Sequence, residues 1–208
     1  MTLATIDANL RAAFRERLRL AVDVDVTVAA TLARGVFTRT SGSWVDDGFA
    51  IGQELTVSGA ASAVANVTGL TANALTTDAA GSATGSMRFQ VKLPSAIAWE
   101  GVKYAPAGKP FVAERVQPAF STRRSMGPDG AIEHRILGHA ALFYPSVGST
   151  LAIERMAGAI MAHFRPGVSL ERGGDKAIVQ NVERSPLMLD GEWLTRSVTV
   201  TFLAFTYA

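Results

Sequence analysis

Three histidines, His134, His139 and His163, are the first residues to consider for chemistry, because imidazole can act as a general base or bind a metal. His134 and His139 lie in one stretch with strand character, and their spacing of five residues directs them to opposite faces. Two such side chains cannot share a metal ion. His163 lies near the end of a predicted helix, where an interaction with the helix dipole is an ordinary role. The histidines therefore predict no active site.

Other catalytic patterns are also missing from the sequence. The adjacent carboxylates Asp46 and Asp47 could suggest a calcium loop, but Gly48 follows them and the stretch has the composition of a turn. There is no G-x-S-x-G elbow, phosphate-binding loop or H-E-x-x-H motif. The absence of cysteine excludes disulfides, thiol catalysis and zinc–thiolate sites. We expect no catalytic residue, no cofactor and no metal, and rank an unrecognised hydrolase as a minor alternative.

Two loops carry side chains that suit contacts with another protein. Residues 122–130, TRRSMGPDG, form a turn-rich loop that is either a solvated tip or a segment that faces a neighbouring subunit. Residues 187–189 are three consecutive apolar residues between two strands, so they are either tucked under or buried by a partner. From these loops we select five candidate assembly-interface residues: Arg123, Arg124, Met126, Leu187 and Met188.

The composition indicates a globular protein. The 208 residues are 48% hydrophobic and 18% charged, and 20 basic against 18 acidic side chains give a net charge of +2. Lysine and arginine form no clustered run, which argues against a sequence-specific nucleic-acid reader. No run of 18 apolar residues is present, and the N-terminal stretch lacks the apolar core of a signal peptide. We therefore expect no membrane partner and a product made in the cytoplasm.

Hydrophobic periodicity predicts two helices and several strands. Apolar residues at steps of three and four from Ile6 to Leu18, and again from Ile153 to Phe164, indicate two amphipathic helices. Ser149 or Thr150 can cap the second helix. Further segments have strand character, and the one at residues 132–144 is apolar on both faces, which predicts a central position in a sheet. They cover residues 22–28, 111–118, 132–144, 177–184 and 194–207.

Residues 35–91 differ from the rest of the chain in composition and in hydrophobic periodicity. Five short strand-like pieces are joined there by turns of small residues, without any helical period. We predict an inserted all-β domain, a small barrel or sandwich, at residues 35–91. Residues 1–34 and 92–208 would form the main domain, with an α+β fold in which two helices pack on a largely antiparallel sheet.

The C-terminal half of the chain resembles a known protein family. The segment from Ile97 to Tyr207 resembles the tail-terminator proteins of long-tailed bacteriophages, the minor tail protein U type. The resemblance rests on the lead-in IAWEG…Y.P, the extended piece PFVAERVQPA, the strand GHAALFYPSVG before the second helix and the final strand in GEWLTRSVTVTFLAFTYA, together with the N-terminal helix. The piece FTRTSGSWVDDGFAIGQELTVSG resembles a small β-module that recurs in phage virion proteins.

The resemblance implies a mechanical role. Tail terminators are similar to one another in forming a hexameric ring that caps the tail tube, stops tube growth and faces the head–tail connector. The implied partners are other copies of the chain, the tail-tube protein and the connector, with DNA passing the lumen without base readout. The implied location is the head-proximal end of the tail, after assembly in the host cytoplasm.

Two alternative functions stay open. One is a tail-tube or head–tail connector protein of related fold. The other belongs to a different class, a host-surface glycan binder in which Trp44 of the insertion stacks on a sugar. The insertion could decorate the tail exterior or brace neighbouring subunits.

Overall fold

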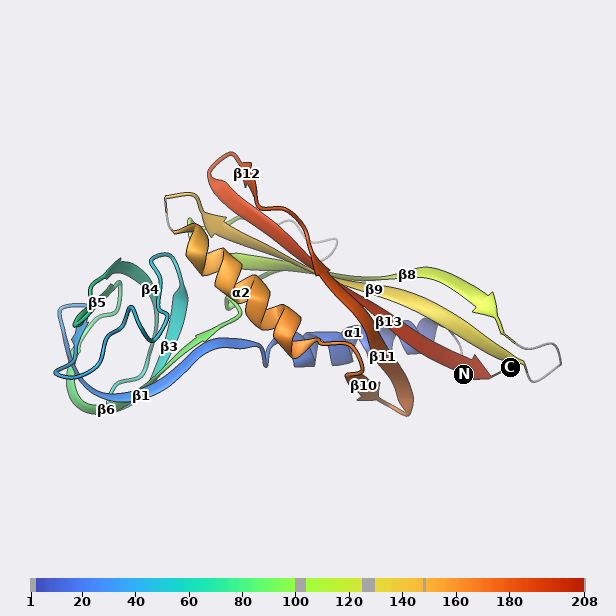
Figure 1. Cartoon of the computed structure of the whole chain (residues 1–208), viewed down its shortest axis with the longest axis horizontal. Helices are drawn as coiled ribbons and strands as arrows, with labels where there is room; N and C mark the ends of the chain where they lie inside the picture. The colour runs from blue at the N-terminus through green and yellow to red at the C-terminus, as the bar shows by residue number, and fades with distance from the viewer. Residues whose placement is uncertain (1–2, 100–103, 125–129, 148, 208) are drawn as a thin grey trace.

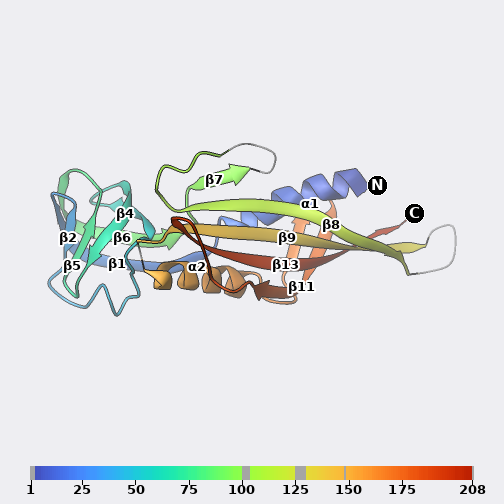
Figure 2. The same cartoon turned by 90° about the horizontal axis from the view of Figure 1, so that it is seen from above.

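The computed structural model describes residues 3–99, 104–124, 130–147 and 149–207 (Figure 1). Within these residues the chain is an elongated molecule with a small barrel at one end and long strands running to the other (Figures 1 and 2). The elements follow in chain order: α1 (Leu3–Leu18), β1 (Val22–Ala33), β2 (Val36–Thr38), β3 (Glu54–Gly59), β4 (Ala63–Leu70), β5 (Ala74–Thr77), β6 (Ser82–Lys92), β7 (Ala96–Trp99), β8 (Phe111–Arg123), β9 (Ala131–Pro145), α2 (Thr150–His163), β10 (Ser169–Arg172), β11 (Asp175–Arg184), β12 (Met188–Asp190) and β13 (Trp193–Tyr207).

The barrel is closed by six antiparallel strands in the order β1-β2-β5-β4-β3-β6. Closure occurs because β1 pairs with both β2 and β6, so its two edges are used. Trp44 fills the centre of the barrel and contacts Phe89 edge-on with ring centroids 4.8 Å apart. Phe37 and Phe49 complete this aromatic core. These rings are part of one hydrophobic core cluster that continues from the barrel into the curled sheet.

The second sheet runs in the order β10-β11-β13-β9-β8-β7, with β12 paired to the end of β13. Strand β9 lies between β13 and β8, which confirms the central position predicted for residues 132–144. Only β7 is parallel to its neighbour. The sheet curls around α1, which contacts strands near both of its edges. Arg11 Nη2 donates to the Val116 carbonyl on β8 at 3.1 Å, and Glu16 pairs with Arg172 on β10.

Both helices lie inside the curl of this sheet. Phe14 of α1 packs against Phe164, at the end of α2, and against Phe202 of β13, with centroid distances of 5.3 and 5.7 Å. Gly138 of β9 leaves the necessary room, since a Cβ there would lie 2.8 Å from both Phe14 and Phe202. Of the two caps predicted for α2, Ser149 is the one that forms, and its Oγ accepts from the Leu151 amide at 3.1 Å.

The expected α+β fold class is wrong. The chain is mostly β: its two helices have only 16 and 14 residues, whereas strands form a closed six-stranded barrel and a sheet curled into a half barrel. The physical reason is strand length. Strands β8, β9 and β13 have 13 to 15 residues, and long twisted strands curl around a pair of short helices instead of forming a flat layer beneath them.

The division into residues 1–34 plus 92–208 and an inserted domain at 35–91 stays a proposal. The strands predicted inside the insertion are present as β2 to β6. However, the barrel also contains β1, which starts at Val22, so a barrel domain would begin before Gly35. Val22 and Lys92 are paired across β1 and β6, so the chain enters and leaves the barrel at adjacent points.

Candidate assembly surfaces

The histidines do not converge in the structure. His134 is buried, and its Nδ1 lies 2.8 Å from Ser121 Oγ. His139 lies on the opposite face of β9, where its Nδ1 is 3.0 Å from Thr199 Oγ1. Burial and the nearby Arg115 lower the pKa of His139, because both disfavour the charged ring. Among the described residues no group of three metal-binding side chains occurs, and no helix is long and apolar enough to cross a bilayer.

Residues 122–124, the described start of the first candidate loop, lie at the end of a projecting arm. We define the arm as residues 118–124 and 131–136, which lie at the end of β8 and at the start of β9. Residues 118 to 123 of β8 are all exposed, although the strand stays paired with β9 as far as Arg123. Arg123 and Arg124 are at the end of this strand, whereas Met126 lies outside the described residues. In Figures 1 and 2 the arm reaches the end of the molecule opposite to the barrel.

A small charged network holds the arm together. Arg124 Nε donates to Glu133 Oε2 at 2.5 Å, and Arg135 Nε lies 3.5 Å from the other oxygen of Glu133. The hydrogen bond from Arg124 is the main reason why the pKa of Glu133 is lowered. The Arg135 guanidinium lies over the ring of Phe120, 5.1 Å from its centroid. The network presents cations and one exposed aromatic side chain to solvent.

The second candidate loop is the hairpin of β12 and β13, residues 187–195. Leu187 packs against the core, whereas Met188 and Leu189 are 59% and 68% exposed. Strand β12 pairs with β13 only, within the described residues, so its other edge faces solvent. Of the two outcomes expected for residues 187–189, Leu187 is tucked under, whereas burial of the next two residues by a partner stays a prediction.

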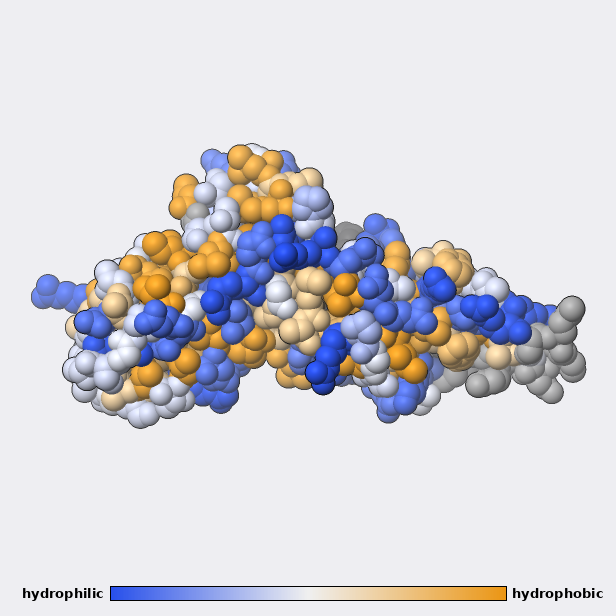
Figure 3. Space-filling model, in the orientation of Figure 1, coloured by the Kyte–Doolittle hydropathy of each residue, from blue (hydrophilic) through white to orange (hydrophobic). Residues whose placement is uncertain are grey.

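Three further exposed apolar residues lie beside this hairpin, and sequence patterns did not single them out. Val147 is 94% exposed in the turn between β9 and α2, and Leu151 is exposed in the first turn of α2. Ile51 of the barrel is next to them, since its carbonyl accepts from the Ser149 amide at 3.2 Å. Apolar side chains gather over this part of the surface (Figure 3). We call Ile51, Val147, Leu151, Met188 and Leu189 the apolar corner.

Polar contacts fix the barrel to the curled sheet beneath this corner. Arg155 Nε of α2 donates to Asp23 Oδ2 at 3.0 Å, and Gln53 Nε2 of the barrel donates to the same oxygen at 3.1 Å. Lys109 lies 3.4 Å from Asp78, beside a hollow of about 470 Å³ between barrel and sheet. Gly48 has φ +94° and lies against the Arg155 guanidinium, so a side chain there would displace it. The position of the apolar corner is therefore set by both parts of the molecule.

The glycan-binding alternative depends on an accessible Trp44, and the structure does not provide one. Trp44 is completely buried in the barrel core, and the Arg39 guanidinium covers its ring at 4.8 Å. A sugar cannot stack on a tryptophan that has no exposed face. Asp46 and Asp47 lie in a turn, as predicted, and Asp47 pairs with Arg39.

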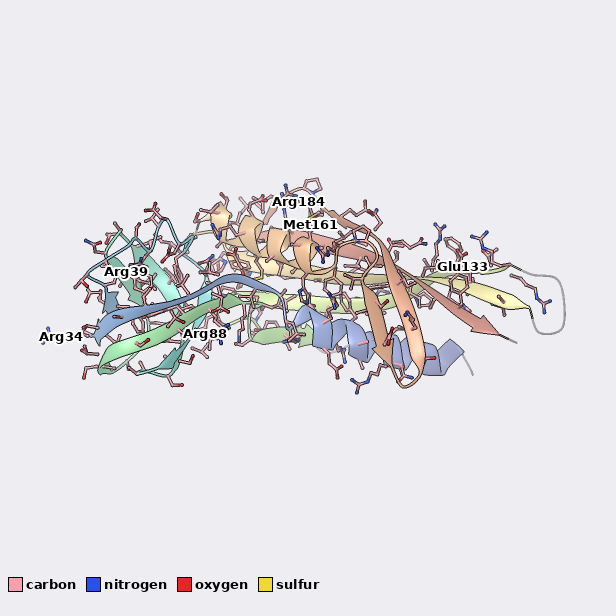
Figure 4. The ribbon with its side chains drawn as sticks, turned by 60° about the horizontal axis from the view of Figure 1, so that its bottom comes forward. Arg34, Arg39, Arg88, Glu133, Met161 and Arg184 are labelled. Atoms are coloured by element: carbon pink, nitrogen blue, oxygen red, sulfur yellow. The ribbon has the colours of Figure 1, made fainter. Side chains whose placement is uncertain are left out.

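The arm and the hairpin lie far apart, as the labels of Glu133 and Arg184 in Figure 4 indicate. The sequence analysis found both loops from turn composition and from a run of apolar residues. It missed Phe120, Val147, Leu151 and Ile51, because each is one apolar residue in an otherwise ordinary pattern. Their exposure follows only from the way the elements pack.

Comparison with known proteins identifies the family. A family model described as "Phage tail terminator protein" matches residues 77–202, which is more than half of the chain but leaves out α1 and most of the barrel. No curated protein matches the chain. One solved structure, whose name states no function, aligns at 18% identity with a TM-score of 0.45, over 54% of this chain and 81% of that one. The match over residues 77–202 shows that this chain belongs to the phage tail terminator family, a family of structural virion proteins.

Proposed function

We propose that copies of this chain form a closed ring, hexameric as in the tail terminators it resembles, that caps the tail tube and ends its growth. The observation that carries this proposal is the family match over residues 77–202. One face of the ring would contact the last layer of tube protein, and the other would form the tail side of the head–tail junction. DNA would pass through the lumen without base-specific contacts, and the ring would assemble in the host cytoplasm.

Features of the molecule support this role. The family that the chain belongs to is structural. Exposed apolar side chains are found both at the arm and at the apolar corner, on distant parts of one molecule. A chain with two different contact surfaces can bind head to tail, and such contacts close into a ring when the rotation per subunit allows it.

Tube polymerisation with and without this chain tests the proposal. Purified tail-tube protein is polymerised alone and with increasing amounts of the chain, and tube lengths are measured by negative-stain electron microscopy. Capping predicts tubes that shorten as the amount of chain rises, with a ring visible at one end. A tube protein would instead form long helical tubes by itself, and a connector would bind finished tails without changing their length.

The role of the barrel is a separate part of the proposal. We infer that it lies on the outside of the ring, either as a decoration or as a brace between neighbours. Its closed sheet has no free strand edge, and its surface is rich in threonine and serine. Rings of a chain that lacks the barrel would still cap tubes if it is a decoration, and would lose stability if it is a brace.

A further inference from the structure

We propose that the arm of one copy binds the hairpin and apolar corner of the next copy, and that this head-to-tail contact closes the ring. The inference rests on the proposed ring and names its contact surfaces. The donor surface is the arm, with Phe120, Arg123 and Arg124 at its end. The acceptor surface consists of Met188 and Leu189, the acidic turn after them, and the neighbouring Val147.

Charge is the first reason to pair these two surfaces. The described residues of the arm, 118–124 and 131–136, hold three arginines against one carboxylate, a net charge of +2. The hairpin, residues 187–195, contains Asp190 and Glu192 and no basic residue, a net charge of −2. Both of these carboxylates lie on exposed residues. Opposite charges of equal size favour the contact between arm and hairpin over contacts of arm with arm or hairpin with hairpin.

The cations closest to the hairpin do not cancel its charge. Arg184 and Arg196 lie at its base, and both donate to Glu154 Oε2, at 3.1 and 2.5 Å. Glu154 neutralises one of these two positive charges, so the hairpin and its base together keep a net charge of −1. Asp190 and Glu192 remain available to cations from another molecule.

Geometry excludes a contact within one copy. The two surfaces lie at opposite ends of the same strand pair, because Glu133 pairs with Phe205 and Pro145 pairs with Trp193. Twelve residues separate Glu133 from Pro145, which is about 40 Å at roughly 3.3 Å per residue. A stiff sheet cannot fold back over that distance. The arm can therefore meet a hairpin only on a different copy of the chain, and the contact is heterologous.

Unpaired strand edges and exposed apolar side chains also suit a contact between the arm and the hairpin. In the described residues the arm part of β8 pairs with β9 only, and β12 pairs with β13 only, so each surface has an unpaired strand edge. Such edges can extend a neighbouring sheet by main-chain hydrogen bonds. Phe120 and Met188 are each about half exposed, and aromatic and methionine side chains are enriched in protein interfaces. The occupant that fits the acceptor surface is a second copy of this chain.

Disulfide trapping tests the contact directly, and the absence of native cysteines makes the result unambiguous. Three single-cysteine variants of the full chain are prepared: Thr122→Cys on the arm, Met188→Cys on the hairpin and Val64→Cys on the exposed barrel surface as a control. Each is oxidised alone and in pairwise mixtures, under conditions where mass photometry detects the oligomer, with tube protein added if it is needed for assembly. The products are separated on a non-reducing gel.

The inference predicts a covalent dimer only in the mixture of Thr122→Cys with Met188→Cys, at least tenfold above every mixture that contains Val64→Cys. Disulfides of Met188→Cys with itself would overturn it, because they indicate a contact related by two-fold symmetry. Oligomers that give no disulfide between these two positions would also overturn it while leaving the ring proposal intact. If no oligomer forms even with tube protein, both proposals fail.

Charge reversal gives a second, independent test. Asp190→Lys with Glu192→Lys, and separately Arg123→Glu with Arg124→Glu, should each reduce the oligomer fraction at least tenfold. The chain that carries all four changes should recover most of it, because the attraction is restored with reversed sign. Circular dichroism spectra equal to that of the unaltered chain establish that each variant is folded. Folded single reversals that assemble normally, or a fourfold variant that does not recover, would contradict the pairing.

Discussion

The barrel and the curled sheet solve the same packing problem in different ways. In the barrel every strand edge is used by closure, and the large aromatic side chains Trp44, Phe37, Phe49 and Phe89 are buried. The curled sheet also has a dense core, but it leaves strand edges at β12 and in the arm, and it exposes Phe120, Met188 and Leu189. Both parts expose some apolar side chains, such as Val64 of the barrel, but only the curled sheet also has unpaired strand edges that suit assembly.

The largest expected effect comes from removing the barrel at two different boundaries. Deleting Val24–Val91 and joining the ends with three Gly/Ser residues should leave a soluble, folded chain, because Val22 and Lys92 are paired neighbours. Deleting residues 35–91 instead should cause aggregation, because β1 then exposes Leu32 and Ala30, which the barrel buries. Size-exclusion chromatography and circular dichroism distinguish the two products. Equal solubility would contradict the inclusion of β1 in the barrel unit.

The next largest effect is expected from cavities made in the sheet part and in the barrel part of the core. Phe202→Ala and Phe89→Ala should each lower the free energy of unfolding by about 3–5 kcal/mol, because both rings are buried among other aromatic rings. The two substitutions should affect different strands. Phe202→Ala should weaken the protection of amides against hydrogen exchange in β9 and β13, and Phe89→Ala should weaken it in the barrel strands. Native-state hydrogen exchange measures this. If both variants lost protection everywhere, the two parts would be one cooperative unit.

Local signals in the sequence predicted most elements but not how the strands close or curl. Alternation and turn residues located the strands at 54–58 and 74–77, and the apolar period with Ser149 located α2. Closure of the barrel depends on β1 pairing with both β2 and β6, and no local pattern encodes a contact over about sixty residues. The arm and hairpin were visible as turn-rich or apolar loops. The opposite charges of the two surfaces could be read from the sequence, but their separation of about 40 Å needed the sheet register.

An intermediate effect is expected where the two parts join. Asp23→Ala removes the carboxylate that accepts from Arg155 and Gln53, and leaves both donors near the junction without that acceptor. We expect a loss of about 1–3 kcal/mol in the free energy of unfolding, measured by urea denaturation, because the carboxylate is buried while Arg155 is partly exposed. Glu171→Ala, which breaks an exposed pair with Lys176, is the matched control and should cost less than about 0.5 kcal/mol. Equal losses would mean that the junction is no tighter than an ordinary surface pair.

The smallest effect concerns a charge pair on the barrel surface. Arg88 donates two hydrogen bonds to Asp25, at 2.8 and 2.6 Å, and these lower the pKa of the Asp25 carboxyl to about 2. Because this pKa is lower in the folded chain than the value of about 3.9 in an unfolded one, the pair stabilises the barrel above about pH 4. That contribution is lost as the pH falls from 4 to 2. Both side chains are exposed, so the change in melting temperature should be slight.

An NMR titration of the side-chain carboxyl carbons can measure this shift where calorimetry cannot. The Asp25 midpoint should lie near pH 2 in the unaltered chain and move up toward 3.9 in Arg88→Gln, because the hydrogen bonds from the guanidinium are gone. Gln90 still donates to Asp25 at 2.8 Å, so the return should be incomplete. A midpoint near 4 in the unaltered chain would show that the barrel leaves this carboxylate unpaired.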